Sequence, residues 1–389
     1  MTQIKEWDST YVAHTYGRFP ISIVEGKGSI LKDENGKEYI DLGSGIAVNT
    51  FGVADDVWIN AVNTQMQKLS HTSNLYYTEP CAKLAKILCE RTGMKKVFFS
   101  NSGAESNECA IKAARKYAAE TLGKDNYYII TLKGSFHGRT ITTLSATGQD
   151  VFHNQFQPLT SGFLYAEPNN VDDIEKLLNE YPCAAVMLEP IQGEGGVNAL
   201  DFEYLKAVEK LAKEHNTLLI VDEVQSGNGR SGKLFAYMNS EIHPDIITTA
   251  KGLGGGLPIG ATLFNEKTAD VYKPGDHGST FGGNPICCAG AISVVERLDD
   301  AFLNEVQKKA DYIWNSLETA KGIKSISGLG LMIGIETERD SSQVLNECME
   351  NGVLVLKAKN KIRLLPPLNI PNSQLKKAIE ILKTACAKV

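Results

Sequence analysis

The chain has 389 residues, a formal net charge of −6, 42% hydrophobic residues and 22% charged residues. This length predicts about two domains, and the balance of residue types is that of a soluble globular protein. The acidic balance and the lack of a dense Lys/Arg run exclude a stripe that binds phosphate backbones, so we expect no nucleic-acid partner and no anionic membrane surface.

The first residues, MTQIKEWDSTYVAH, contain no apolar stretch typical of a secretory signal. No apolar run approaches the roughly 18 residues that a membrane-spanning helix needs. Eight cysteines are scattered along the chain without CxxC pairs or histidines at ligand spacing. This pattern predicts reduced thiols, no metal site and a cytoplasmic location.

In chain order, residues 21–42 predict an N-terminal β meander with turns at Gly26–Gly28 and Asn35–Gly36. From about Pro80, helical periodicity alternates with short apolar runs. We expect helices over 81–91, 105–122, 171–180 and 202–214, and strands over 97–99, 128–130, 185–188, 218–221 and 246–247. The alternation predicts an α/β domain with a parallel sheet. Beyond Pro285 we expect one long helix over 286–311 and strands over 328–336 and 352–356.

Polar residues follow these strands, where open α/β sheets place their ligands. After the strand at 97–99, Ser102 and Glu105 match a capping box that opens the next helix. Gly103 permits close approach to the unpaired N–H groups at that helix end, which could bind a phosphate. An ordinary capped helix is the alternative reading.

Asp222 ends the buried strand at 218–221, where a carboxylate is costly unless it is partnered. A protonated pyridine nitrogen would partner it, and an acid there keeps such a nitrogen protonated. A metal ion or a helix cap explains the residue equally well.

Lys251 follows the strand at 246–247 and opens the stretch KGLGGGLPIG, which has no other charge for over ten residues. Partial burial lowers a lysine pKa and yields the neutral amine that attacks aldehydes. Lys251 is therefore the strongest catalytic candidate in the sequence.

The loop Gly134–Arg139 follows the strand at 128–130. Phe136 could stack on a planar ring, and Arg139 could bind a carboxylate through two hydrogen bonds. A surface turn is the alternative. Without a Ser or Cys partner at a known spacing, we interpret His137 as structural.

Six motifs occur in order: NSGAE at 101, FHGRT at 136, EPIQGEGG at 189, VDEVQ at 221, AKGLGGGLPIGA at 250 and HGSTFGGNP at 277. With these motifs the chain resembles the class III (ω-amino acid) aminotransferases over nearly its whole length. The resemblance implies the α/β fold type I of pyridoxal-5′-phosphate (PLP) enzymes, with a mostly parallel seven-stranded sheet in a large domain and a smaller αβ domain. We expect an N-terminal segment at 1–50 that packs with the small domain, the large domain at 51–285 and the small domain at 286–389.

The resemblance also implies roles for individual residues. Lys251 would carry PLP as a Schiff base and move the proton, Asp222 would pair with the pyridinium nitrogen, and Gln225 would meet the phenolic oxygen. The remaining cofactor contacts would be Phe136 and Val224 on the two ring faces, Ser102, Gly103 and Ala104 at the phosphate, and Thr280 reaching that phosphate from the other subunit of a homodimer with shared active sites. The substrate-binding residues would be Arg139, Glu194, Ser279 and Arg363.

The implied reaction transfers an ω-amino group from a small-molecule donor to 2-oxoglutarate in two half-reactions. Arg139 would bind the distal carboxylate, and Arg363 would bind a carboxylate beside the ring only when Glu194 releases it. Ornithine, succinylornithine, succinyl-diaminopimelate and 4-aminobutyrate are alternative donors. A PLP mutase on the same fold and a cofactor-binding protein without turnover are further alternatives. A dinucleotide-binding oxidoreductase is disfavoured because GLGGG does not open a βα unit.

The chain departs from the family pattern at two places. Residues 52–56 read GVADD where the family often has Gly-His-x-His-Pro, which could alter a helix entrance. Asn228 and Ser231, in GNGRSG, replace a more usual apolar residue and a threonine. Either substitution could shift the loop beside the cofactor.

Overall fold

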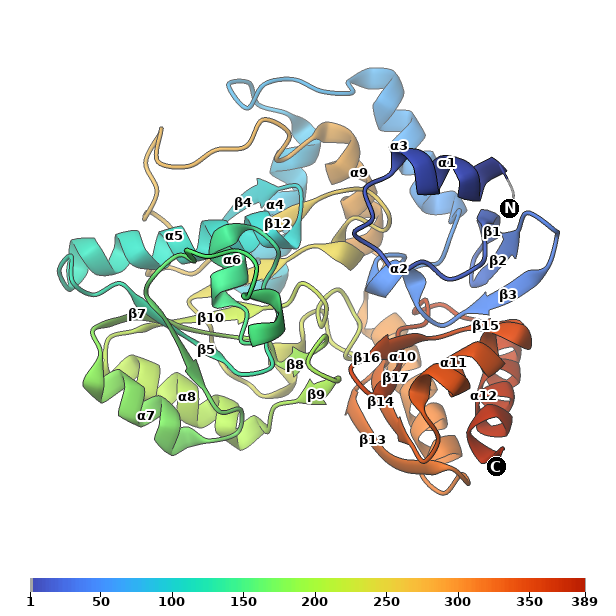
Figure 1. The fold of residues 1–389 in the computed structure, drawn as a ribbon. Coiled ribbons are helices and arrows are strands. Elements are labelled where there is room, and N and C mark those ends of the chain that lie inside the picture. Colours follow the sequence, from blue (N-terminus) through green and yellow to red (C-terminus); the bar gives the residue numbers. More distant parts are fainter. Residues whose placement is uncertain (1–2, 389) are drawn as a thin grey trace.

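The structure is a computed structural model that describes residues 3–388. Met1, Thr2 and Val389, which lie at the outer limits of the predicted domains, are outside the described residues. The chain forms two lobes (Figure 1). One lobe surrounds the largest sheet, and the other brings the N-terminal strands beside the C-terminal part of the chain.

The largest sheet has seven strands in the order β4-β12-β11-β10-β7-β5-β6. Its strands are β4 (Lys96–Ser100), β5 (Tyr128–Leu132), β6 (Phe163–Ala166), β7 (Cys183–Leu188), β10 (Leu218–Asp222), β11 (Ile246–Thr249) and β12 (Gly260–Phe264). β12 pairs antiparallel with β11 and β4, and the other neighbouring pairs are parallel. The predicted α/β class and the mostly parallel seven-stranded sheet are confirmed.

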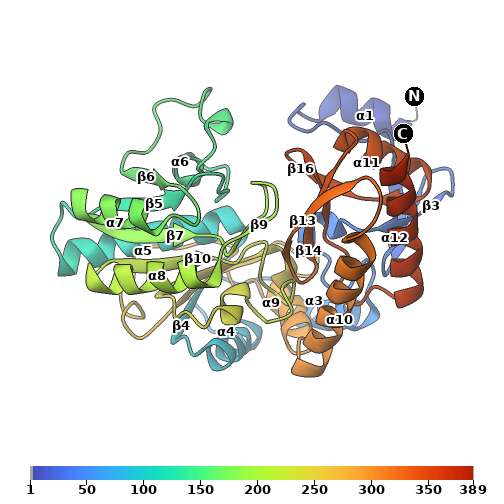
Figure 2. The ribbon, with the colours of Figure 1, turned by 90° about the horizontal axis from the view of Figure 1, so that it is seen from below.

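Helices cover both faces of this sheet (Figure 2). They are α5 (Gly103–Thr121) on one face, and α7 (Val171–Glu180) and α8 (Phe202–Glu214) on the other. Alternate side chains of β10 belong to two hydrophobic clusters: Leu218 and Ile220 join the cluster that includes α5, and Leu219 and Val221 the cluster that includes α8. Burial on both faces explains why β10 reads as a continuous apolar run.

The five expected strands of this region all lie within observed strands. Two strands of the sheet, β6 and β12, were missed. β6 is an edge strand whose first three residues are only partly buried, so its apolar signal is weak. β12 follows a glycine-rich and proline-containing stretch, whose composition favours a loop.

The predicted meander forms β1 (Ile23–Lys27), β2 (Ile30–Asp33) and β3 (Glu38–Asp41). Its second turn is at Gly36, which has φ +81°. β3 also pairs in parallel with β15 (Val353–Leu354), so the N-terminal strands share a sheet with the C-terminal part. The domain limits at residues 50 and 285 stay a prediction.

The long helix predicted over 286–311 is wrong. The chain forms α9 (Pro285–Val295) and α10 (Asp300–Leu317), and the break coincides with Asp299, whose side chain caps α10 by accepting a hydrogen bond from Phe302 N at 2.8 Å. An aspartate favours this capping position over a helix interior.

Two predicted C-terminal strands also differ from the structure. The region 328–336 spans a hairpin of β13 (Ile323–Leu329) and β14 (Met332–Thr337), which turns at Gly330 with φ +59°. The region 352–356 divides between β15 and β16 (Leu356–Ala358), which belong to different sheets. The C-terminal sheet has the order β13-β14-β17-β16, with β17 at Lys361–Leu364.

The remaining longer helices are α1 (Gln3–Tyr11), α3 (Asp56–Lys68), α4 (Glu79–Thr92), α11 (Ser341–Glu350) and α12 (Asn372–Ala387). α9 packs against α3 and α4.

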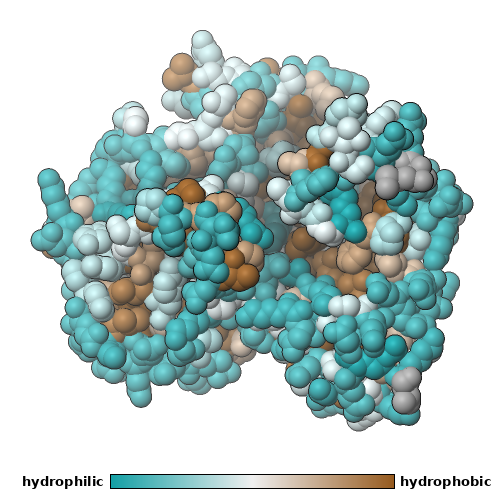
Figure 3. Space-filling model, viewed as in Figure 1, coloured by the Kyte–Doolittle hydropathy of each residue, from teal (hydrophilic) through white to brown (hydrophobic). Residues whose placement is uncertain are grey.

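Figure 3 shows a mostly hydrophilic face with hydrophobic residues gathered in a hollow below the N-terminal helix. Within residues 3–388, no helix is both long and apolar enough to cross a bilayer.

Candidate active site

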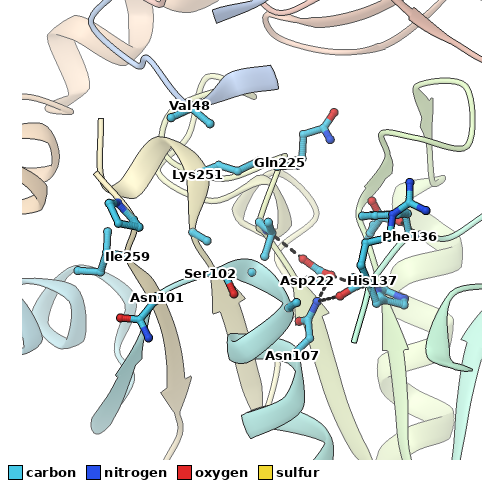
Figure 4. Close-up of a pocket in the computed structure, with 18 of the residues that line it drawn as sticks. Val48, Asn101, Ser102, Asn107, Phe136, His137, Asp222, Gln225, Lys251 and Ile259 are labelled. Atoms are coloured by element: carbon cyan, nitrogen blue, oxygen red, sulfur yellow. Dashed lines mark hydrogen bonds and ion pairs between the residues drawn. The ribbon is translucent and has the colours of Figure 1, made fainter. Parts of the chain in front are cut away.

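A cavity of about 420 Å³ opens at the carboxyl ends of the parallel strands. The loops after β4, β5, β7, β10 and β11 all contribute to its wall, as expected for an open α/β sheet. The predicted site residues in this wall are Ser102, Gly103, Ala104, Phe136, Arg139, Asp222, Val224, Gln225 and Lys251. Figure 4 labels five of them: Ser102, Phe136, Asp222, Gln225 and Lys251.

Lys251 lies just after β11 and extends into the cavity (Figure 4). Its backbone has φ +45°, which residues with a side chain rarely adopt. Burial and the nearby Arg363 cation lower its pKa, whereas the carboxylates of Glu194 and Asp222 oppose that shift. Because of the lowered pKa, a larger fraction of the Lys251 amine is in the neutral, nucleophilic form near neutral pH.

The helix end predicted to bind an anion is formed as expected. Ser102 caps α5 by accepting a hydrogen bond from Glu105 N at 3.2 Å. Glu105 reaches back to Asn101 N at 2.6 Å, one residue earlier than in a standard capping box. The first intrahelical hydrogen bond runs from Ser106 N to Ser102 O. The N–H groups of Gly103 and Ala104 come before it, so they lie at the positive end of the helix dipole, and both residues line the cavity.

Gly103 is sterically required at this helix end. A Cβ at this position would lie 2.6 Å from Val224 Cγ1, so only glycine lets the helix approach the loop after β10. Val224 and Phe136 both line the cavity. Their positions are compatible with the two apolar contacts predicted for a flat ring.

The carboxylate of Asp222 is buried and held on both oxygens. Oδ1 accepts a hydrogen bond from Val224 N at 3.0 Å, and Oδ2 accepts one from Asn107 Nδ2 at 2.7 Å and contacts His137 Nδ1 at 2.8 Å. His137, which we interpret as structural, therefore contacts the predicted cofactor-binding acid directly. Its Nε2 is buried without a partner within residues 3–388.

Asn107 was missed because it resembles any other polar residue on α5. Its Nδ2 also donates to His137 O at 2.7 Å, and its Oδ1 accepts from Thr248 Oγ1 at 2.6 Å. The side chain thus joins α5, the loop after β5 and two strands below the cavity. No local sequence signal would identify this contact, because its partners are separated in the chain.

Glu189 is a second residue that was not predicted. It directly follows β7 and lines the cavity. Its oxygens accept hydrogen bonds from Phe136 N at 2.8 Å and Gly193 N at 3.3 Å. Burial and the nearby Asp222 carboxylate raise its pKa well above the ordinary value. The sequence did contain a signal for Glu189, because an acid at the end of a buried strand is the same pattern that identified Asp222.

Glu194 and Arg363 lie beside the cavity and form an ion pair. Glu194 is in the turn between β8 (Ile191–Gln192) and β9 (Asn198–Ala199), and its Oε1 is 2.6 Å from Arg363 Nη1. Gln225 bridges the pair, since its Nε2 donates to Glu194 at 3.2 Å and its Oε1 accepts from Arg363 at 3.1 Å. Burial opposes ionisation of Glu194, but Arg363 more than offsets it, so the pKa of Glu194 is lowered.

Arg139 is exposed at the cavity wall, with its guanidinium 4.3 Å from the centre of the Phe152 ring. Ser279 lies behind the wall, where its Oγ accepts from Asn101 Nδ2 at 3.1 Å. Thr280 is exposed and is not part of this wall. The predicted contacts of Thr280 with another subunit stay a prediction.

The two departures from the family pattern are accommodated locally. Asp55 caps α3 by accepting from Trp58 N at 2.9 Å, and it pairs with Arg297 at 2.9 Å. The altered stretch at 52–56 therefore still provides a helix start. Ser231 is buried and its Oγ accepts from Asn239 Nδ2 at 3.3 Å.

Comparison with known proteins agrees with this geometry. The family model for class III aminotransferases matches residues 11–386. The acetylornithine aminotransferase of Haemophilus ducreyi is 49% identical over 98% of this chain and 97% of its own length. Among solved structures, an ornithine aminotransferase of Toxoplasma gondii, with partial occupancy of PLP at its active site, has a TM-score of 0.93 and 34% identity over 99% of this chain and 94% of that one.

An acetylornithine aminotransferase of Elizabethkingia anophelis has a TM-score of 0.88 and 33% identity, over 98% of each chain. These likenesses extend over the whole fold, and the family match includes every predicted site residue. The chain is therefore a member of the class III aminotransferase family.

Proposed function

We propose that the protein is a PLP-dependent acetylornithine aminotransferase of arginine biosynthesis. It transfers the ω-amino group of N2-acetylornithine to 2-oxoglutarate, producing N-acetylglutamate 5-semialdehyde and glutamate. The observation that carries the cofactor assignment is the placement of Lys251 and Asp222 in one cavity with the N-terminus of α5. The donor assignment is supported by curated relatives of that name at 41–49% identity.

The residues present fit PLP. The N–H groups of Gly103 and Ala104 suit the phosphate, and the buried Asp222 carboxylate suits a protonated ring nitrogen. Asp222 already receives hydrogen bonds from Asn107 and Val224, which orient the carboxylate. The cofactor, when bound, supplies an aldehyde and a ring that accepts the electron pair released at the substrate carbon.

Lys251 performs the proton transfer. The Nζ of Lys251 would hold the cofactor through its aldehyde and, once freed by the incoming substrate amine, would accept the proton from the substrate carbon that bears that amine. Burial helps because it disfavours the ammonium form of the side chain. Phe136 and Val224, which line the cavity, would pack against the ring and help to exclude water from the reacting atoms.

The site must accept two substrates of different shape. N2-acetylornithine presents a terminal amine with its carboxylate far from the ring, whereas glutamate has a carboxylate beside the reacting carbon. We assign Arg139 to the distal carboxylate in both cases. Arg363 binds the proximal carboxylate of glutamate after Glu194 swings away, and the Glu194–Arg363 pair stays closed for the ω-amino donor.

We assign a homodimer in which Ser279 and the partner's Thr280 complete the site, and a cytoplasmic location. The exposed Thr280 and the exposed aromatic residues Tyr76, Tyr77 and Phe281 support this assembly. A shared site predicts that subunit dissociation and loss of activity occur together. Analytical ultracentrifugation alongside dilution assays measures both.

A donor panel tests the function. N2-acetylornithine, ornithine, N2-succinylornithine, N-succinyl-diaminopimelate and 4-aminobutyrate are each supplied with 2-oxoglutarate, and glutamate formation is followed. We expect the highest kcat/KM with N2-acetylornithine and no glutamate from the Lys251→Ala variant. Preference for another donor rejects the donor assignment. Failure of borohydride to fix PLP on Lys251 rejects the cofactor assignment, and turnover without 2-oxoglutarate indicates a mutase.

A further inference from the structure

Three side chains restrain the turn that contains Lys251, each by a hydrogen bond to a backbone carbonyl; the three carbonyls belong to alternate residues. The hydrogen bonds run from Asn228 Nδ2 to Ala250 O at 3.2 Å, from Thr50 Oγ1 to Gly252 O at 2.8 Å and from Trp58 Nε1 to Gly254 O at 2.9 Å. The donors come from the loop after β10, from the segment before α3 and from α3 itself. Three separate parts of the chain therefore restrain one short turn.

This turn has an unfavourable backbone. Lys251 has φ +45°, in the left-handed region. A left-handed conformation at a residue with a Cβ persists only where its surroundings impose it. The bond from Asn228 is the one that acts on the peptide joining Ala250 to Lys251, because it binds the carbonyl of that peptide.

Asn228 is suited to this position in two ways. Its own φ is +55°, which asparagine tolerates better than most residues with a side chain. Its Nδ2 also donates to Thr249 Oγ1 at 2.9 Å, so one amide group binds both residues that precede Lys251. The usual apolar residue of the family at this position would make neither bond.

The amide is retained although it is incompletely satisfied. Asn228 is 3% exposed, and its Oδ1 is buried without a partner within residues 3–388. An unsatisfied buried acceptor destabilises the fold, so a smaller or apolar side chain would be favoured if packing alone mattered. The two bonds made by Nδ2 are the compensating feature.

We propose that Asn228 is a positioning residue for Lys251, which holds the peptide before the lysine so that its amine extends into the cavity. The proposal rests on the proposed function, in which that amine captures PLP. Without the amide, the turn relaxes toward an ordinary negative φ, and the amine moves away from the buried position that lowers its pKa.

Capture of PLP by the apoprotein tests this directly. Asn228→Gly and Asn228→Asp both permit a positive φ and both remove the donor to Ala250 O. Asn228→Asp is nearly the same size and can still accept a hydrogen bond from Thr249. The matched controls are Asn216→Gly and Asn216→Asp, because Asn216 has φ +54° and is exposed at the end of α8.

The readouts are the rate at which absorbance rises at roughly 410–430 nm after PLP is added, as expected for this cofactor bound to an amine, and the pH at which that rate is half-maximal. We expect both Asn228 variants to capture PLP about tenfold more slowly, with the half-maximal pH moved upward. The Asn216 variants should behave as the wild type. Borohydride reduction and peptide mapping identify the labelled lysine.

If Asn228→Asp captures PLP at the wild-type rate and with the wild-type half-maximal pH, the positioning role is overturned. The proposed function would still stand in that case, provided that PLP is fixed on Lys251. Wild-type protein that fixes no PLP on Lys251 would overturn both proposals. Thermal melting of the apoproteins shows whether each variant is folded. If Asn228→Gly is unfolded, the near-isosteric Asn228→Asp decides the question.

Discussion

Removing the Glu194 carboxylate should change which substrates the site prefers. Glu194 Oε1 is 2.6 Å from Arg363 Nη1, and the Arg363 side chain is 3% exposed. A hydrogen bond between charged groups of this kind contributes about 1.5–3 kcal/mol. If a carboxylate beside the ring must displace Glu194, each α-amino substrate loses that free energy on binding, whereas an ω-amino donor does not.

We therefore expect Glu194→Ala to raise the ratio of kcat/KM for glutamate to kcat/KM for the ω-amino donor by about 10- to 100-fold, since 1.36 kcal/mol corresponds to a factor of ten. Arg363 should stay in place, because its Nη1 is also bonded to Gln225 Oε1 at 3.1 Å and Gly193 O at 3.3 Å. Glu194→Gln should give an intermediate ratio, since it keeps the contact but loses the charge.

The two half-reactions can be measured separately by stopped-flow absorbance of the bound cofactor with either substrate in excess. Glu305→Ala is a matched control, because Glu305 forms a 2.6 Å pair with Lys308 on the exposed side of α10. An unchanged ratio in Glu194→Ala would refute the gating role of the pair. An equal increase for both substrates would show that Glu194 acts on the chemistry and not on substrate choice.

Two further predictions concern stability and cofactor affinity. Burial raises the pKa of Glu223 from 4.5 to about 7. The stability that its neutral form contributes is present below about pH 4.5 and is lost as the pH rises through about 7, which lowers the free energy of unfolding by about 3 kcal/mol. Glu223→Gln should remove most of this decrease in urea denaturation at pH 5 and pH 8, and parallel pH profiles for both proteins would contradict the assignment. Gly103→Ala should weaken PLP binding about tenfold, because the added Cβ would lie 2.6 Å from Val224 Cγ1. Gly17→Ala is the control, since a Cβ there meets nothing within 4 Å, and equal PLP affinity in the two variants, measured by equilibrium dialysis, would contradict the steric argument.

Much of the fold and of the site could be predicted because the relevant signals are local. Ser102, Asp222 and Lys251 each follow an apolar run by one to four residues, and those runs form strands of the central sheet. The predictions that failed depended on finer features. A capping aspartate at position 299 divides an apparently continuous helix, and Gly330 turns an apparently continuous strand into a hairpin.

The contacts of His137, Asn107 and Glu189 could not be derived in the same way. Asn107 and Asp222 are 115 positions apart in the chain, and His137 and Asp222 are 85 positions apart. Each residue looks ordinary in its own segment. They meet because β5, β7, β10 and β11 lie side by side and α5 crosses the same face.

The amino-acid sequence by itself determined where reactive side chains would be found, since residues that end buried strands of an open parallel sheet collect at its carboxyl edge. Only the tertiary structure decided which partner each ionisable group meets. The order β4-β12-β11-β10-β7-β5-β6 differs from the chain order; it puts Lys251 and Asp222 at the ends of neighbouring strands, and the loop after β5 brings His137 into contact with Asp222. Long-range strand pairing depends on the packing of the whole core, and no single segment encodes it.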